Sequence, residues 1–192
     1  MTNQTKTVQD FLLTRRSFPY KTLTTPAPTA DQLAPLLTAA ARVPDHGKLE
    51  PWRFIVLTGA ALPRLADLAT KRGAALDIGP DNITKASATF ANAPLIVAVI
   101  ASPQPSEKVP EIEQLYSAGA VCLSLLNVAL AAGWGANWLS GWPSHDRIFL
   151  IDGLKLAAHE TVAGFIHIGT GNTPPPERPR PDLNTLTTWI SR

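Results

Sequence analysis

Residues Ala40–Val56 read A-A-R-V-P-D-H-G-K-L-E-P-W-R-F-I-V, and this stretch joins a predicted helix to a predicted buried strand. Proline and glycine interrupt the part between Val43 and Pro51, which indicates a loop. From Arg42 to Trp52 the stretch holds an arginine, a histidine, a lysine, two acids and a tryptophan. Because binding groups concentrate on loops held by a rigid scaffold, a binding loop fits these residues, and so does an ordinary polar loop anchored by Trp52.

On both sides of this stretch, predicted helices alternate with predicted strands. Thr7 with Asp10 and Thr29 with Gln32 form N-terminal capping patterns for the first two helices. Apolar spacing predicts further helices at residues 62–76, 82–91, 111–132 and 145–150, and strands at 54–57, 95–100, 134–140 and 165–168. An excess of helices around one small sheet indicates an α+β or α/β sandwich.

The predicted helix at residues 111–132 is apolar on nearly every side from Ala118 onward. A helix without a polar face is expected in the interior of a fold. Ser117, Ser124 and Asn127 disfavour a membrane span, which needs roughly 20 mostly apolar residues. Cys122, the one cysteine of the chain, allows no internal disulfide and fits a buried, inert thiol better than a redox centre.

Composition sets broad limits on the function. The chain has 192 residues, of which 45% are hydrophobic, and a formal net charge of +2. These values favour one folded domain spanning residues 1–192, without the basic run that nucleic-acid binding needs. The polar N-terminus has no signal-peptide pattern, so we expect a soluble cytoplasmic protein with no membrane partner. The proline-rich end, about residues 172–192, is expected to be an arm that packs on another surface, with a second subunit as one candidate.

Common catalytic and metal-binding motifs do not occur in the sequence. There is no G-x-x-x-x-G-K-[ST], no G-x-G-x-x-G, no H-E-x-x-H and no paired-cysteine spacing. The four histidines are scattered, and His167 alternates within an apolar strand, which favours a structural histidine with its hydrogen bonds satisfied. We therefore expect no metal site.

Two other groups of residues suit a ligand. Arg15, Arg16 and Ser17 place two guanidinium groups and a hydroxyl at a helix end, which fits either a bound phosphate or two solvated arginines. After the long helix come three tryptophans, an asparagine and a serine, which fit either the wall around a flat aromatic ring or a hydrophobic core. These residues are Trp134, Asn137, Trp138, Ser140 and Trp142.

Taken together, these segments resemble the FMN-dependent nitroreductase family, and in particular its short branch of NAD(P)H nitroreductases. The most specific match is the pattern A-x-x-P-D-H-x-x-x-x-P-W-x-F from Ala41 to Phe54. The other matches, in chain order, are Arg15–Ser17, Ser117–Ala120, Trp138–Gly141 and Val162–Thr170. Order and spacing fit from about residue 8 to residue 171.

The resemblance implies an α+β fold, a three-layer α-β-α sandwich with a central, mostly antiparallel sheet and a long buried helix. It also implies an intertwined homodimer that binds FMN at the interface between its subunits. The implied activity passes hydride from NADH or NADPH through FMN to a small acceptor such as a nitroaromatic or a quinone. Because flavin N5 carries this chemistry, no catalytic side chain is implied.

The resemblance also implies roles for single residues, first around the phosphate of FMN. Arg15, Arg16 and Ser17 would hold the phosphate and the ribityl chain. Arg178 and Arg180 fall where many relatives place a late basic residue near the phosphate.

Around the flavin ring, Arg42 and His46 would make contact from the partner subunit. Trp138, Leu139 and Ser140 would lie along the isoalloxazine through backbone and side chain. The end of the long helix is the implied contact of the nicotinamide nucleotide. That segment consists of Val128, Ala129, Leu130, Ala131, Ala132 and Gly133.

Two positions depart from the family pattern. Pro19 stands where many relatives have a basic residue that meets flavin N1, which leaves the reduction potential of the flavin open. Lys21 is close in sequence but would need a different path to the flavin. Leu139 stands where close relatives carry arginine, and this loss of charge favours apolar ligands.

Other functions fit the same residues. A flavin-binding protein without fast turnover, such as a sensor or an FMN carrier, is the main alternative. A different flavin reaction on this scaffold, such as reductive dehalogenation, is another, and a structural domain without a cofactor is a third. The sequence leaves open the physiological acceptor and the choice between NADH and NADPH.

Overall fold

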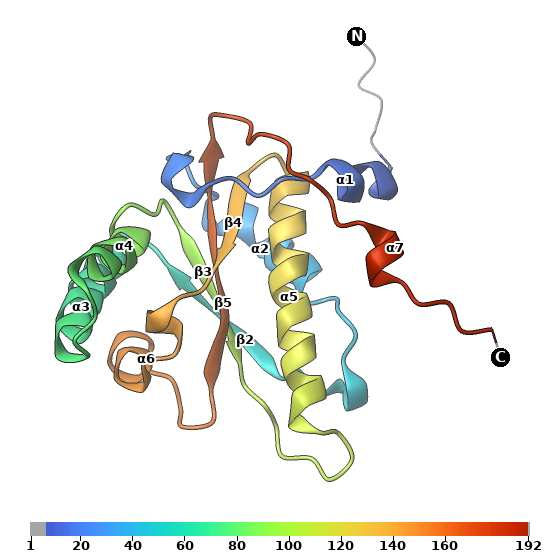
Figure 1. The fold of residues 1–192 in the computed structure, drawn as a ribbon. Coiled ribbons are helices and arrows are strands. Elements are labelled where there is room, and N and C mark those ends of the chain that lie inside the picture. Colours follow the sequence, from blue (N-terminus) through green and yellow to red (C-terminus); the bar gives the residue numbers. More distant parts are fainter. Residues whose placement is uncertain (1–6, 192) are drawn as a thin grey trace.

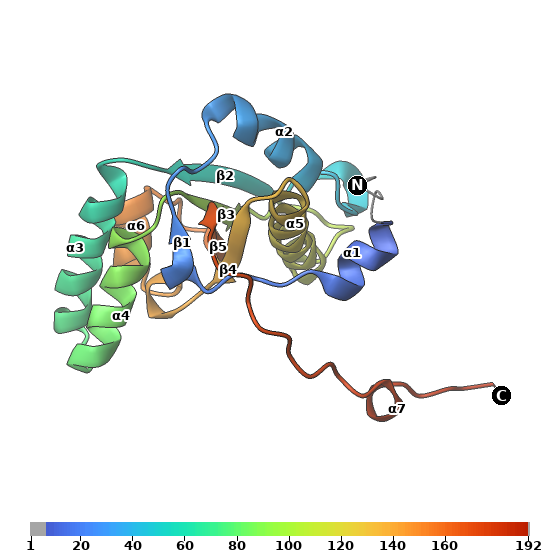
Figure 2. The same cartoon turned by 90° about the horizontal axis from the view of Figure 1, so that it is seen from above.

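The computed structural model describes residues 7–191, in which one sheet lies between two layers of helices (Figures 1 and 2). Helices α3 (Ala61–Ala75), α4 (Pro80–Ala91) and α6 (Arg147–Leu154) cover one face of the sheet. Helices α2 (Ala30–Ala40) and α5 (Glu111–Ala131) cover the other face. Outside these layers lie α1 (Val8–Thr14), near the end of α5, and α7 (Leu183–Leu186), on an arm that leaves the body.

The sheet is built around its longest strand, β5 (Thr161–Gly171). Two strands pair with β5, β3 (Ile96–Ala101) on one side and β4 (Gly135–Leu139) on the other. The strand β2 (Trp52–Leu57) pairs with the free edge of β3. The short β1 (Leu23–Thr24) pairs with the end of β5. All of these pairs are antiparallel. The fold is therefore the predicted α+β three-layer sandwich rather than the α/β alternative.

Each face of the sheet buries its own hydrophobic core. On the side of α3, α4 and α6, the ring of Phe90 lies 5.4 Å from Phe149 and 5.3 Å from Phe165, measured between ring centroids. On the side of α2 and α5, Val121 and Leu125 are fully buried against the sheet. β3 is buried along its whole length because both faces of this central strand are covered.

The two predicted capping boxes are confirmed. Thr7 Oγ1 accepts from the Asp10 N–H at 3.1 Å, and Thr29 Oγ1 accepts from the Gln32 N–H at 3.3 Å. In both cases the acid or amide side chain bonds back to the capping residue's own N–H. These local bonds satisfy N–H groups that the first helical turn leaves free, which is why the sequence alone predicts both helix starts.

Several predicted boundaries are wrong for identifiable reasons. The helix predicted from His145 begins at Arg147, because Asp146 caps it by accepting from the Phe149 N–H at 3.1 Å. The strand predicted at 165–168 extends from Thr161 to Gly171, because Gly164 and Gly169 lie close against Trp138 and Thr24 and do not end the strand. The short strand β1, Leu23–Thr24, is not among the strands predicted from the sequence.

Helix α5 is only half enclosed, contrary to the prediction of a helix surrounded by the fold. Ile112, Tyr116 and Leu123 are 50%, 68% and 47% exposed. The helix is long and apolar enough to cross a membrane, but its other face packs on the sheet as a core helix does. Cys122 lies on that buried face, and burial raises the pKa of its thiol to about 12, as expected for an inert cysteine.

Gly135 marks a close approach between β4 and the strands beside it. An added Cβ would lie 2.6 Å from a methyl group of Leu23 and 2.9 Å from the backbone of Gly171. Because a paired backbone cannot move aside as a side chain can, Gly135→Ala should lower the free energy of unfolding by about 1–3 kcal/mol in urea denaturation. Gly79→Ala is the control, since nothing lies within 4 Å of its added Cβ, and it should cost roughly 0.5 kcal/mol. Equal stability of the two variants would contradict this packing.

Candidate functional site

Five of the residues implied by the resemblance meet in one cavity of about 430 Å³, which we call the arginine cavity. It lies between the end of α1, the edge strand β4 and the start of the C-terminal arm. Its lining consists of Arg15, Arg16, Ser17, Pro19, Asn137, Arg178 and Arg180. The fold thus brings arginines from opposite ends of the chain to one place.

The chain after α1 holds the first of these arginines in position. Arg15 has φ −59° and ψ 142°, so the helix ends there and the backbone continues extended. The Phe18 N–H donates to the Ala136 carbonyl at 2.9 Å, and the Asn137 side-chain amide donates to the Phe18 carbonyl. These bonds attach residues 15–19 to the edge of β4.

The arginine cavity carries an excess of positive charge. Glu177 lies 3.3 Å from Arg16 and 2.8 Å from Arg180, but four arginines line the cavity. Arg15 donates from Nη2 to Ser17 Oγ at 2.8 Å, while its Nε is buried without a hydrogen-bond partner. Burial, together with the charges of Arg180 and Arg16, lowers the pKa of Arg15 below its usual range. A bound anion would remove both the repulsion and the unmade hydrogen bond.

A second cavity of about 640 Å³, which we call the β5 cavity, lies between α4, the end of β4 and the face of β5. Part of its lining is apolar, namely Ile78, Ala86, Phe90, Leu139, Trp142, Pro143 and Phe165. The remainder is Tyr20, Lys21, Asn82, Lys85, Thr89, Ser140, Gly141, Ser144 and His167. An apolar cavity of this size with a few polar and cationic groups suits a flat aromatic ligand.

His167 lies in the wall of the β5 cavity, and the structure corrects the expectation of a histidine with satisfied hydrogen bonds. Its side chain is 1% exposed, yet Nδ1 is buried without a hydrogen-bond partner. Burial lowers the pKa of the imidazole to about 4, so His167 is neutral at ordinary pH.

The two cavities lie side by side along one face of the sheet. Asn137 lines the arginine cavity, and its cross-strand partner His167 lines the β5 cavity. Pro19 lines the first and the next residue, Tyr20, lines the second. A ligand with a phosphate at one end and an aromatic ring at the other could therefore occupy both.

The segment implied for the nicotinamide nucleotide lies only partly at a surface. Leu130, Ala131 and Gly133 line a third cavity of about 800 Å³, which also touches Arg15 and Arg16. Ala129 is fully buried in the core. Three members of the segment are thus accessible beside the arginines.

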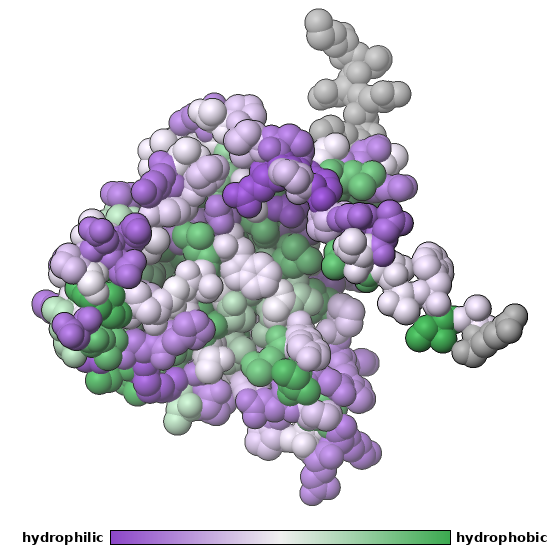
Figure 3. Space-filling model, in the orientation of Figure 1, coloured by the Kyte–Doolittle hydropathy of each residue, from purple (hydrophilic) through white to green (hydrophobic). Residues whose placement is uncertain are grey.

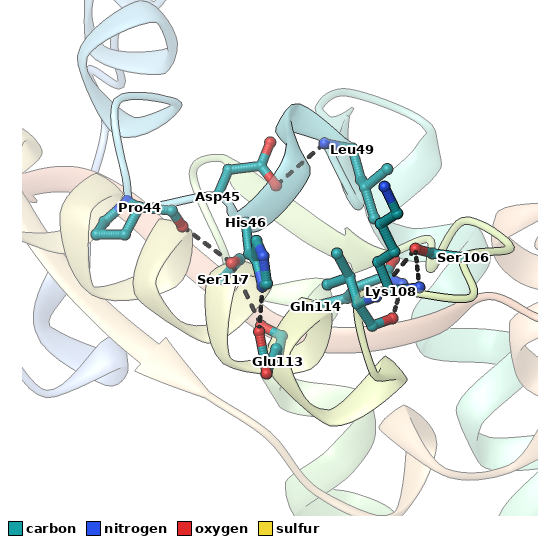
Figure 4. A network of polar contacts seen from close by, with 10 residues as sticks. Pro44, Asp45, His46, Leu49, Ser106, Lys108, Glu113, Gln114 and Ser117 are labelled. Carbon is teal, nitrogen blue, oxygen red and sulfur yellow. Dashed lines mark hydrogen bonds and ion pairs between the residues drawn. The ribbon is translucent and has the colours of Figure 1, made fainter.

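The Arg42–Trp52 loop lies at the opposite end of α5 (Figure 1), and Figure 4 shows its contacts with the first turns of that helix. His46 Nδ1 is 2.7 Å from Glu113 Oε2, in the first turn of α5, and Ser117 Oγ donates to the Pro44 carbonyl at 2.9 Å. Leu130, near the other end of α5, lines the third cavity together with Arg15 and Arg16. The helix rise between Glu113 and Leu130 therefore places the loop about 25 Å from the arginines. One chain therefore does not bring Arg42 and His46 to the two cavities.

Within the segment Trp138 to Ser140, only Leu139 and Ser140 line the β5 cavity. The indole of Trp138 lies on the other face of β4, over Gly164. Asn82 and Lys85, one turn apart on α4, line the cavity but were not predicted from the sequence. The sequence of α4 carries no signal for this role, because polar residues on a helix usually face solvent. Asn82 and Lys85 reach the cavity only because α4 packs beside β4 and β5.

Comparisons with known proteins show which family the chain belongs to. The model of the nitroreductase family matches residues 12–170. A Haemophilus influenzae protein named "Putative NAD(P)H nitroreductase" is 37% identical over 162 residues, which cover 83% of this chain and 86% of that protein. The Escherichia coli K12 protein named "Putative NAD(P)H nitroreductase YdjA" is 32% identical over 161 residues, which cover 84% of this chain and 86% of that protein.

Solved structures share the fold at lower sequence identity. A nitroreductase-like family protein from Bacillus cereus superimposes with a TM-score of 0.82 at 22% identity, over 99% of both chains. A Desulfovibrio desulfuricans protein, described as a "putative nitroreductase in complex with fmn", gives a TM-score of 0.74 at 21% identity, over 97% of this chain and 99% of that chain. With the family model and the relatives matching most of its length, the chain belongs to the nitroreductase family.

Proposed function

We propose that the protein is an FMN-dependent oxidoreductase that takes hydride from NADH or NADPH and reduces a small acceptor such as a nitroaromatic or a quinone. The observation that carries the proposal is the buried, unpartnered Nε of Arg15 in a cluster of four arginines beside a large, mostly apolar cavity. The names of the relatives and the FMN complex of a protein with the same fold support it.

The arginine cavity fits the phosphate end of FMN. Arginine forks pair with phosphate oxygens through two parallel hydrogen bonds, and Arg15, Arg16, Arg178 and Arg180 all border the cavity. Ser17 Oγ and the Asn137 amide lie beside them and suit the phosphate and the first ribityl hydroxyls. The cavity volume of about 430 Å³ accommodates such a group.

The β5 cavity fits the isoalloxazine ring. Leu139 and Ser140 form its wall on the side of β4, and Asn82 and Lys85 face it from α4. We assign Asn82 and Lys85 to the polar edge of the ring, because amide and ammonium groups match its carbonyl oxygens and ring nitrogens. These two residues extend the set of cofactor contacts that the sequence implied.

Lys21 offers the positive charge that Pro19 cannot supply. Pro19 precedes a short 3₁₀ helix, Tyr20–Thr22, which carries Lys21 into the wall of the β5 cavity. The ammonium lies 6.0 Å from the centroid of the Tyr20 ring, within reach of a cation–π contact. Lys21 and Lys85 would then stabilise the reduced, anionic flavin without a basic residue at position 19.

Bound FMN would supply the redox chemistry, accepting a hydride from the nicotinamide nucleotide and returning two electrons to the acceptor. The protein's own residues position the ring and tune its surroundings. Phe165 and Trp142 exclude water from the inner wall of the β5 cavity, and the two lysines place positive charge at its rim. No side chain here needs to act as nucleophile or metal ligand.

We also propose that the protein is a homodimer whose interface covers the exposed apolar surfaces of α1, α5 and the C-terminal arm. Figure 3 shows apolar side chains gathered over α5 and α1. Trp189 on the arm is 90% exposed, and Tyr116 on α5 is 68% exposed. A partner packed along α5 could bring its own Arg42 and His46 to the flavin, which one chain alone cannot do.

The dimer predicts a specific response to charge on α5. Tyr116→Glu with Leu123→Glu should convert a dimer into a monomer, because carboxylates would be buried without partners at the interface. Ile148→Glu with Ile151→Glu, on the comparably exposed surface of α6, is the matched control and should stay dimeric. Sedimentation equilibrium distinguishes these results. Dissociation by the α6 pair and not by the α5 pair would place the interface elsewhere.

Turnover tests the catalytic part of the proposal. FMN-loaded protein should oxidise NADH or NADPH at about 1 per second or faster when a quinone or nitroaromatic is added, since enzymes of ordinary efficiency reach that rate. The rate should fall when the acceptor is omitted under anaerobic conditions. Tight FMN binding with turnover far below that value would instead support a flavin carrier or sensor.

A further inference from the structure

Buried polar atoms without hydrogen-bond partners concentrate at the two cavities. In the described part of the chain, five residues have such side-chain atoms: Arg15, Asn127, Trp142, Ser144 and His167. Arg15 lines the arginine cavity, and Trp142, Ser144 and His167 all line the β5 cavity. Because an unmade hydrogen bond of a buried group is costly, this concentration indicates groups that a ligand completes.

His167 stands out among these residues by its position in the sheet. It lies in the middle of β5, paired with β3 on one side and β4 on the other, so its backbone is fixed. The ring of Tyr20 lies beside it, with the two ring centroids 5.9 Å apart at 59°. The imidazole is neutral because burial disfavours its charged form, and it therefore has one N–H donor and one nitrogen acceptor.

His167 also lies where the two cavities meet. Its cross-strand partner Asn137 and the neighbour of Tyr20, Pro19, both belong to the arginine cavity. A ligand with its phosphate among the arginines and its ring in the β5 cavity must cross this junction. In FMN bound this way, the groups nearest the junction would be the ribityl hydroxyls closest to the ring, N1 and the C2 carbonyl, all of which can form hydrogen bonds.

We propose that His167 is a further cofactor-binding residue, whose imidazole forms a hydrogen bond with FMN where the ribityl chain joins the isoalloxazine. The inference rests on the proposed function, since it requires FMN to bind across both cavities. The proposed contact of His167 differs from those of the arginines and lysines, because a neutral imidazole adds no charge to the site. A neutral group there can fix the ring without altering the electrostatic balance set by Lys21 and Lys85.

The test compares FMN with riboflavin, which has the same ring and ribityl chain but no phosphate. His167→Phe should weaken both flavins by the same factor, about tenfold in Kd, because it removes one hydrogen bond and keeps the ring volume. His167→Gln, which retains a donor and an acceptor, should stay within about threefold of wild type. Arg15→Ala should weaken FMN and leave riboflavin nearly unchanged.

A measurement on the unmutated protein guards against a folding effect of the variants. With ¹⁵N-labelled histidine, a ring-nitrogen signal of His167 should shift when riboflavin is added. Unchanged riboflavin affinity in His167→Phe, or unshifted His167 nitrogens at saturating riboflavin, would overturn this proposal alone. Wild-type protein that binds neither flavin would overturn the proposed function as well.

Discussion

Arg15→Ala combined with Ser17→Ala is expected to weaken FMN binding by about a hundredfold or more while the fold is retained. Arg15 and Ser17 are joined at 2.8 Å and line the cavity that we assign to the phosphate. Each charge-assisted hydrogen bond to the phosphate contributes about 1.5–3 kcal/mol, and every 1.4 kcal/mol is tenfold in Kd. Flavin fluorescence during titration measures the loss directly.

The unliganded variant should be at least as stable as wild type. The Arg15 guanidinium is partly buried and repelled by Arg180 and Arg16, so its removal relieves an unfavourable charge when no anion is present. Lys71→Ala, an exposed cation on α3, controls for the change in net charge and should leave FMN affinity unchanged. FMN affinity that survives in the Arg15 and Ser17 variant would contradict the assignment of the phosphate site.

Glu160→Ala should lower the free energy of unfolding by about 2–3 kcal/mol, the largest effect that we expect from the loss of one ion pair in this protein. The Glu160 carboxylate is almost fully buried and accepts from Arg53 Nε at 2.6 Å, from Arg53 Nη2 at 2.7 Å and from the Ala157 N–H at 2.9 Å. These bonds join β2 to the turn before β5. The expected loss is below that of a wholly buried pair because the Arg53 side chain is 41% exposed.

The same pair predicts a pH dependence with a definite sign. The hydrogen bonds from Arg53 hold the pKa of Glu160 at about 2, against an ordinary value of 4.5. The charged Glu160 carboxylate therefore stabilises the folded state fully above pH 4.5. This stabilisation is lost as the pH falls toward 2 and the carboxylate is protonated. The difference in unfolding free energy between wild type and Glu160→Ala should therefore shrink over that range.

Urea denaturation from pH 7 to pH 2.5 measures this difference. Glu107→Ala, an exposed acid in the loop before α5, should differ from wild type by less than about 0.5 kcal/mol at every pH. A difference between wild type and Glu160→Ala that stays constant with pH would show that the carboxylate charge does not account for the stabilisation.

Local chemistry explains which elements the sequence predicts well. The capping boxes at Thr7 and Thr29 are complete within four residues, so the helix starts follow from the sequence. The start of α6 was misplaced because Asp146, and not His145, supplies the cap. The sequence predicts that α5 is buried on every side, because apolar residues lie all around the helix. In the structure the sheet covers only one side of α5, and the other side is exposed.

The site could be predicted only where the family motifs mark it. Arg15–Ser17, Arg178 and Arg180 follow from the resemblance, and the structure brings them together from distant parts of the chain. Asn82 and Lys85 carry no local signal, because their role depends on α4 lying beside β4 and β5. His167 was predicted as buried but not as unpartnered, since the surroundings of a side chain are not readable from strand alternation.

The most direct test of the central claim is an absorption spectrum of the purified protein incubated with FMN, taken before and after NADH or NADPH is added without oxygen. We expect a flavin band near ~450 nm that remains with the protein after desalting and bleaches when the nucleotide is added. A protein that retains no flavin after desalting, or a bound flavin that neither nucleotide bleaches, would contradict it.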